Sequence, residues 1–265
     1  MMTKKSNYLK FAVETALEAG NEILMENYGK MQELEWNAKQ HFRTEVDRMS
    51  DMLIRKRIKE NFPEHNIYSE ENEGIDQSSE FSWVVDPLDG TIPYRYGITD
   101  HFSVCISLVK RKIPIVGVIY APKRKELYYA EQGTGAFCDD KSISVSLEEN
   151  VNRIIIGLDG GKETQTFKRA TIAKYIEKVY SPEGITCFTA SGCASVPLCL
   201  VASGKMHAYM ALSLEPWDMA AAVIINREAG GKVTDINDKE WDIGDESIVA
   251  ANFKLHKNLF SLLKI

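Results

Sequence analysis

The spacing of β-type runs changes near residue 145, and this change constrains the fold more than any other feature of the chain. Between residues 66 and 138, short runs at 66–69, 83–86, 103–109, 113–120, 126–130 and 135–138 are separated only by turns. Closely spaced strands without intervening helices predict an antiparallel sheet. Beyond residue 145, strands at 153–157, 186–189, 206–212 and 247–251 alternate with helices at 166–179, 194–202, 217–229 and 254–263. This alternation is typical of a more parallel α/β arrangement.

Two amphipathic helices precede these strands. Apolar residues recur at three- and four-residue steps over 6–28 and again over 44–61, and a polar stretch through Lys39 and His41 between them predicts a mobile loop. We expect an α+β subdomain over residues 1–145, carrying the antiparallel sheet, and an α/β subdomain over 146–265, and the two share one continuous body.

Composition limits the classes of partner. The chain has 265 residues and a formal net charge of −6, which argues against nucleic acid as a partner because phosphate backbones require a basic face. Its 5 cysteines show no metal-binding spacing, which favours free thiols in a reducing compartment. No signal peptide is visible, and the longest apolar runs are far shorter than a membrane span. We expect a cytoplasmic protein with no membrane partner.

Carboxylates are concentrated where apolar runs end. Glu70 follows the run at 66–69, Asp86 and Asp89 end the run that begins at Trp83, and Asp218 opens the helix at 217–229. Magnesium takes several oxygen ligands, commonly carboxylates together with water and substrate phosphate. These four acids therefore predict a site for a hard divalent cation. We expect the subdomain over 1–145 to carry most metal ligands and the subdomain over 146–265 to complete the metal and substrate site.

The stretch from Asp86 to Thr91 predicts a turn. Asp86 and Asp89 are three residues apart, whereas residues on one face of a strand are two apart. Pro87 fixes its own backbone angle, and Gly90 can adopt unusual angles. Such a turn aims both carboxylates and the Leu88 carbonyl into one space. It also leaves the backbone N–H groups of Gly90 and Thr91 for a phosphate oxygen.

In this order and at these separations, the motifs resemble those of the inositol monophosphatase family of magnesium-dependent, lithium-sensitive phosphatases. The resemblance rests on Glu70-Glu71, on the segment 86–91 and on the segment 217–221 followed by 228–231, with further similarity over 117–122 and 133–138. It extends from about residue 8 to the C-terminus. It implies the layered αβαβα sandwich shared with fructose-1,6-bisphosphatases, an α+β / α/β fold that is usually dimeric.

The resemblance also implies a role for each residue, with two or three Mg²⁺ ions in the site. Glu70, Asp86 and the Leu88 carbonyl correspond to the ligands of the first ion, Asp86, Asp89 and Asp218 to those of the second, and Glu70 to a ligand of a weaker third. Thr91 and Asp47 are similar to the family's water-activating pair, so the catalytic set is Glu70, Thr91 and Asp47. The substrate-binding set is Asp89, Gly90, Thr91, Gly192, Cys193, Ala194 and Asp218.

Several of these residues have structural alternatives. Thr44 and Asp47 fit an N-cap and an acid in the first turn of the helix at 44–61, and Asp218 also suits the positive end of its own helix. Glu71 is interpreted as a solvated neighbour and left out of the ligand set. Ala211 stands where the animal inositol enzymes carry a glutamate that grips inositol hydroxyls, and Pro93 replaces a usual asparagine.

We therefore predict a magnesium-dependent phosphomonoesterase that hydrolyses a small phosphorylated polyol or sugar through a metal-activated water. The alternatives on the same fold are a fructose-1,6-bisphosphatase and a phosphatase acting on 3′-phosphoadenosine phosphates, NADP or histidinol phosphate. A non-catalytic relative that binds metal and phosphate is a further alternative. With Ala211 in place of a carboxylate, we expect a roomier pocket that repels anions less, and broad activity. A small phosphorylated substrate and a second copy of the chain are the expected partners.

Overall fold

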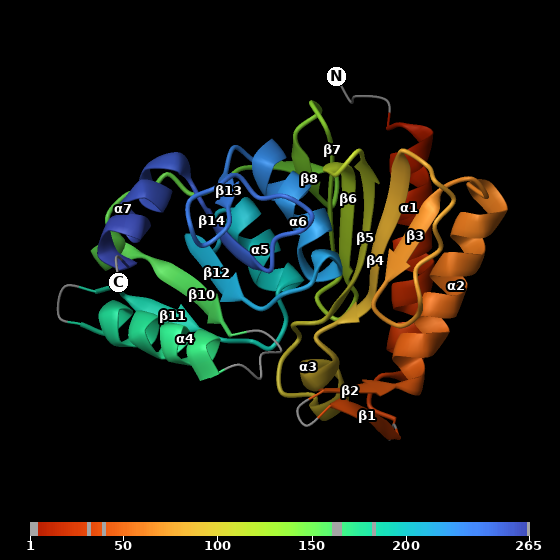
Figure 1. Ribbon diagram of the computed structural model, residues 1–265, viewed down its shortest axis with the longest axis horizontal. Coiled ribbons are helices and arrows are strands. Elements are labelled where there is room, and N and C mark those ends of the chain that lie inside the picture. The colour runs from red at the N-terminus through yellow and green to blue at the C-terminus, as the bar shows by residue number, and fades with distance from the viewer. Residues whose placement is uncertain (1–4, 31–32, 39–40, 161–165, 182–183, 264–265) are drawn as a thin grey trace.

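Helices and sheets alternate in five layers, as Figure 1 shows for the computed structural model, which describes residues 5–30, 33–38, 41–160, 166–181 and 184–263. Two helices lie on the outer face of one sheet, two lie between the sheets, and two cover the outer face of the other sheet. The predicted αβαβα sandwich is confirmed. Within the described residues, no helix combines the length and the apolar character needed to cross a bilayer.

The larger sheet has seven strands in chain order. They are β3 (Asn66–Ser69), β4 (Phe81–Asp89), β5 (Ser103–Lys110), β6 (Ile113–Ala121), β7 (Glu126–Glu131), β8 (Ala136–Cys138) and β9 (Lys141–Ile143). Every neighbouring pair from β4 to β9 is antiparallel, as predicted, whereas β3 pairs with β4 in parallel.

The smaller sheet has five strands in the order β11 (Cys187–Thr189), β10 (Ile155–Asp159), β12 (Ala208–Leu212), β14 (Ser247–Ala251) and β13 (Lys232–Thr234). β10 is parallel to both of its neighbours, and the other pairs are antiparallel. The predicted parallel character of the second half is therefore confirmed only around β10. A short 3₁₀ helix (Val151–Arg153) leads into this sheet.

The outer helices each cover one sheet. α1 (Asn7–Glu18) continues as a π-helical stretch (Ala19–Met25) and packs with α2 (Glu45–Asn61) on the larger sheet. α4 (Thr166–Val179) and α7 (Phe253–Leu263) lie together on the far side of the smaller sheet. Each of these helices presents one apolar face, which is the pattern expected of a helix covering a sheet.

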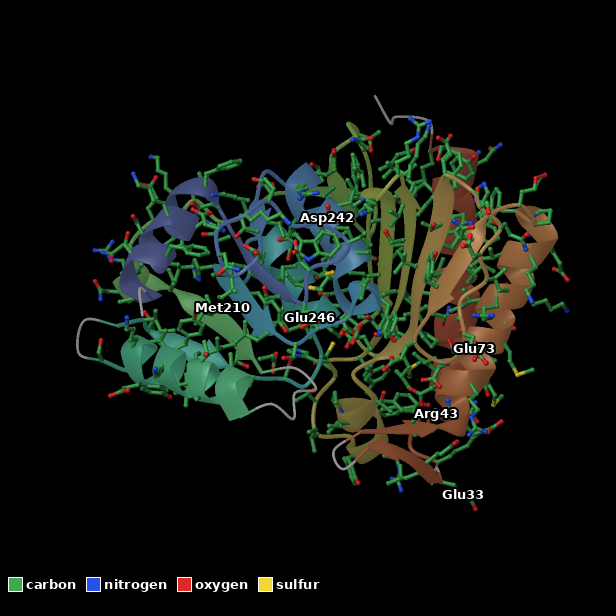
Figure 2. The ribbon with its side chains drawn as sticks, viewed as in Figure 1. Glu33, Arg43, Glu73, Met210, Asp242 and Glu246 are labelled. Atoms are coloured by element: carbon green, nitrogen blue, oxygen red, sulfur yellow. The ribbon has the colours of Figure 1, made fainter. Side chains whose placement is uncertain are left out.

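The middle layer consists of α5 (Ser195–Ala202) and α6 (Pro216–Glu228), and Figure 1 shows both between the two sheets. α6 is buried without interruption from Asp218 to Asn226, which fits a helix with protein on all sides. Side chains of β12 alternate between two cores: Tyr209 and Ala211 face this middle layer, whereas Met210, labelled in Figure 2, faces α4 and α7.

The structure corrects two local predictions. Part of the segment predicted as a mobile loop forms the antiparallel hairpin of β1 (Leu34–Ala38) and β2 (His41–Thr44), whereas Lys39 lies outside the described residues. Residues 86–89 are not a turn but the end of β4, with an irregular register between Asp86 and Asp89. A bulge is a position where a strand tolerates proline, which explains Pro87. The chain turns instead at Gly90, which has a φ of 85° and precedes the six-residue helix α3 (Thr91–Tyr96).

Candidate active site

Three buried aspartates meet between the two sheets. One carboxylate oxygen from each of Asp86, Asp89 and Asp218 lies within 4.8 Å of the others. We call these three residues the acid cluster. Three negative charges this close repel one another strongly when they are shielded from water. A hard divalent cation relieves that repulsion, and an all-carboxylate set of oxygen donors is the kind that Mg²⁺ prefers.

The irregular end of β4 supplies two members of the acid cluster. Asp86 lies opposite Cys105 of β5 and Asp89 lies opposite Ser103, so three residues of β5 span four of β4. Asp86 Oδ1 accepts a hydrogen bond of 3.0 Å from the Leu88 N–H. The bulge therefore brings Asp86 and Asp89 to one space although their spacing does not fit a regular strand.

Asp218 comes from the first turn of α6. Its Oδ2 accepts a hydrogen bond of 2.8 Å from the Glu215 N–H, which forms part of a capping box. Asp218 therefore caps α6 and also belongs to the acid cluster. The two roles that the sequence suggested for this residue are compatible.

Asp89 is held by the N-terminal end of α5. Its Oδ2 accepts hydrogen bonds from the N–H groups of Ala194 (3.0 Å) and Ser195 (2.7 Å) and from the Ser195 hydroxyl. The Cys193 thiol also donates to it, over 3.0 Å. Donors at a helix N-terminus stabilise a negative charge. Cys193 and Ala194, which were predicted to contact substrate, therefore donate hydrogen bonds to Asp89 through the Cys193 thiol and the Ala194 N–H.

Thr91 and Asp47 are hydrogen-bonded. The Thr91 hydroxyl donates to Asp47 Oδ1 over 3.1 Å and also lies 3.3 Å from the Leu88 carbonyl oxygen. Asp47 Oδ2 accepts from the Thr44 N–H (2.7 Å) and hydroxyl (2.5 Å), so Asp47 is also the capping acid of α2. Burial, together with the nearby charge of Glu70, raises the pKa of Asp47 to about 6. With its proton donated to either Asp47 Oδ1 or the Leu88 carbonyl oxygen, the Thr91 oxygen can accept a hydrogen bond from a water molecule.

Glu70 and Glu71 follow β3 on the α2 side of the site. The Glu70 N–H donates to the Val85 carbonyl, and the Glu70 side chain does not belong to the acid cluster found among the described residues. The interpretation of Glu71 as a solvated neighbour is wrong, because its side chain is only 4% exposed and lies 3.5 Å from Arg43 Nη1. Burial and the charges of Asp47 and Glu70 raise the pKa of Glu71 to about 8. Figure 2 labels Arg43 at the junction of β2 and α2.

One acid near the site was missed from the sequence. Asp159 ends β10, where its Oδ1 accepts from the Gly192 N–H (3.5 Å) and its Oδ2 from the Tyr209 hydroxyl (3.2 Å). Burial raises the pKa of Asp159 to about 6, and the charge of Asp89 contributes in the same direction. Its position at the carboxyl end of a strand in the alternating half of the chain was the available signal, since binding residues gather at such ends.

Comparison with known proteins gives matches along the whole chain. A model of the inositol monophosphatase family matches residues 4–264. A fructose-1,6-bisphosphatase/inositol-1-monophosphatase of Aquifex aeolicus is 33% identical over 99% of this chain and 97% of the relative. A putative Nus factor SuhB of Neisseria meningitidis is 31% identical over 97% of each chain. The crystal structure of the extragenic suppressor protein suhB from Bartonella henselae aligns with a TM-score of 0.91 at 29% identity, covering 98% of this chain and 99% of the other.

Proposed function

The chain belongs to the inositol monophosphatase family, and we propose that it is a magnesium-dependent phosphomonoesterase acting on a small phosphorylated polyol or sugar. The observation that carries this proposal is the joint presence of the acid cluster and the Thr91–Asp47 hydrogen bond. A protein that only binds a metal and a phosphate has no need for a hydroxyl placed to orient water. The pair therefore favours hydrolysis over binding alone.

The residues that would hold the ions are Asp86, Asp89 and Asp218, with the Leu88 carbonyl and Glu70 completing the set. When bound, Mg²⁺ supplies positive charge for the phosphate oxygens and lowers the pKa of a coordinated water. The first turn of α3 offers backbone N–H groups at Gly90 and Thr91, which a helix leaves without intrahelical partners and which suit a phosphate oxygen. The Thr91 hydroxyl accepts a hydrogen bond from the attacking water while its own proton stays on the Asp47 side.

The relatives' names leave two alternatives for this chain. The Aquifex aeolicus relative is named for both fructose-1,6-bisphosphatase and inositol-1-monophosphatase activity, which supports a substrate range that includes a sugar bisphosphate. Other relatives are named Nus factor SuhB, so a binding role beside or instead of hydrolysis is the second candidate. We further propose that lithium inhibits the enzyme and that it works as a cytoplasmic homodimer.

The test is phosphate release from inositol 1-phosphate, fructose 1,6-bisphosphate, histidinol phosphate, NADP and 3′-phosphoadenosine phosphates, each with Mg²⁺ and with a chelator. We expect Mg²⁺-dependent turnover of at least one polyol or sugar phosphate. Asp86→Asn should lower that turnover about 10²–10³-fold, since it removes one charged element of the site. Asp76→Asn, in an exposed loop, is the matched control. Absence of turnover on every compound, or full activity of Asp86→Asn at saturating Mg²⁺, contradicts the proposal.

A further inference from the structure

Asp159 is a largely buried carboxylate beside the site that the proposed chemistry does not use. Its two oxygens accept hydrogen bonds from Gly192 and from Tyr209, and Tyr209 is itself 0% exposed, so the orientation of the carboxylate is fixed. The backbone of Ser191 also donates to it. All three donors are uncharged. A carboxylate has about four acceptor positions, so the donors among the described residues leave at least one position for a further donor.

The loop that holds Asp159 also holds the acid cluster. Gly192 donates to Asp159, and two residues later Ala194 donates to Asp89, so residues 192–194 bridge the two carboxylates. A Cβ built on Gly192 would lie 3.8 Å from Pro93, in the first turn of α3. Asp159 therefore stands beside the proposed phosphate position, on the side of the smaller sheet, and is not a member of the acid cluster.

The register of the smaller sheet places Asp159 next to Ala211. The expectation of a pocket that repels anions less rested on the methyl group at Ala211 and did not count this neighbouring carboxylate. A partly buried charge is unfavourable unless donors compensate for it. Hydroxyl groups of a substrate can provide that compensation, whereas a second phosphate next to Asp159 would add repulsion.

We propose that Asp159 is a specificity-determining residue, whose carboxylate accepts hydrogen bonds from hydroxyl groups on the end of the substrate away from the reacting phosphate. This proposal rests on the proposed phosphatase activity and deepens it. It predicts that the substrate is a polyol or sugar monophosphate with free hydroxyls, and that a second phosphate at this end is disfavoured. A substrate ammonium group would satisfy the same carboxylate, so the test must separate the two kinds of donor.

The experiment compares wild type, Asp159→Asn, Asp159→Ser and the control Asp76→Asn. The kcat/KM is measured for inositol 1-phosphate, fructose 1,6-bisphosphate, histidinol phosphate and p-nitrophenyl phosphate, the last of which carries no hydroxyls. We expect Asp159→Asn to lower kcat/KM for inositol 1-phosphate about 10- to 100-fold, mainly through KM, since one hydrogen bond to a charged group has about this effect. Turnover of p-nitrophenyl phosphate should change less than about twofold, a margin well below one such hydrogen bond.

Failure of this inference and failure of the proposed function are distinguishable. A wild type that hydrolyses none of the four compounds contradicts the function itself. A wild type that is active, with both Asp159 variants keeping its ratio of inositol 1-phosphate to bisphosphate hydrolysis, overturns only the role of Asp159. A loss restricted to histidinol phosphate overturns the hydroxyl assignment. Equal losses on all four compounds in Asp159→Asn and Asp159→Ser show a structural role and overturn it as well.

Discussion

Thr91 has a single hydroxyl proton and two acceptors within reach, Asp47 Oδ1 and the Leu88 carbonyl oxygen. The Leu88 carbonyl is also one of the proposed metal-binding groups. The two proposed roles of the site, holding the ion and orienting water, thus fall to neighbouring groups, the Leu88 carbonyl and the Thr91 hydroxyl. A substitution that removes only the hydroxyl separates them.

Thr91→Ala should therefore lower kcat about 10²–10³-fold, the usual cost of losing one oriented catalytic group. The Mg²⁺ concentration for half-maximal activity should stay within about threefold, because the substitution removes no carboxylate. A magnesium titration of activity measures both quantities, and Thr91→Ser, which keeps the hydroxyl, serves as the control. If Thr91→Ala lost magnesium affinity to the same extent as it lost kcat, Thr91 would have a structural role in the metal site and not the proposed catalytic one.

Single residues of the site could be predicted where a short segment of the sequence is enough to identify their role. Asp86, Asp89 and Asp218 meet as predicted because the irregular end of β4 and the first turn of α6 face the same space between the sheets. Glu71 was misjudged because nothing in its neighbours along the chain reveals that Arg43 covers it. Asp159 was missed because its significance depends on a loop more than thirty residues further along the chain, at Gly192.

At the scale of one element, α7 is anchored by a buried neutral histidine. The Thr234 hydroxyl donates to the Asp235 carbonyl, so it accepts from His256 Nε2 at 2.9 Å. Burial and the charge of Lys232 lower the pKa of His256 from 6.5 to about 4, although Asp238 opposes that shift. Protonation of this ring therefore favours the unfolded chain.

The lowered pKa of His256 predicts how the stability of the protein depends on pH. The His256 contribution is fully present above the unfolded pKa of 6.5 and is lost as the pH falls toward about 4. It amounts to about 2–3 kcal/mol in the free energy of unfolding. Urea denaturation at pH 7 and pH 5 should show a smaller loss of stability for His256→Gln than for wild type. Lys257→Gln, on the exposed side of α7, should match the wild-type loss, and an equal loss in all three proteins contradicts the assignment.

Elements with strong apolar patterns were predicted closely, and so were the short strands β8 and β11, whereas three other short elements were not. The strands at 66–69 and 247–251 have the predicted bounds because turn residues flank clear β-type runs. The three-residue strands β9 and β13 and the six-residue helix α3 are too short to establish a periodicity. The π-helical stretch Ala19–Met25 keeps the helical pattern of its neighbours, so no sequence signal separates it from α1.

At the scale of the whole molecule, the contact between α6 and the larger sheet determines whether Asp218 on α6 meets Asp86 and Asp89 on β4. α6 approaches β6 at Gly117, where a Cβ would lie 2.4 Å from the Ala221 carbonyl oxygen and 2.4 Å from Ile224 Cγ2. The carbonyl belongs to helix backbone and cannot move aside alone. Any side chain at this position therefore pushes α6, and Asp218 with it, away from β4.

Gly117→Ala should lower the free energy of unfolding by about 2–3 kcal/mol, at the upper end of the range for overpacked sites. It should also weaken Mg²⁺-dependent activity, because Asp218 no longer meets Asp86 and Asp89. Thermal melting and the phosphate-release assay measure the two effects. Gly244→Ala, where a Cβ meets nothing within 4 Å, should change neither. A stable and fully active Gly117→Ala protein would show that α6 is free to shift.

The layer order was predictable as a whole only through the resemblance to a known family, because the pattern of strands and helices does not say which helices lie between the sheets. The uniformly apolar segment 219–225 carries the one local hint, since a helix without a polar face is buried on all sides.

The position of α6 also has a consequence for synthesis of the chain. β4 and the rest of the larger sheet leave the ribosome well before α6, which lies between residues 216 and 228. Until then the inner face of that sheet, with Val84, Ile119 and Tyr128, lacks the helix that covers it in the native protein. Domains fold as units during synthesis, and uncovered apolar sheet is prone to aggregation. A chain that still lacks α6 therefore holds only two members of the acid cluster and exposes an apolar face of the larger sheet. The synthesis of α6 completes both the hydrophobic core and the proposed metal site.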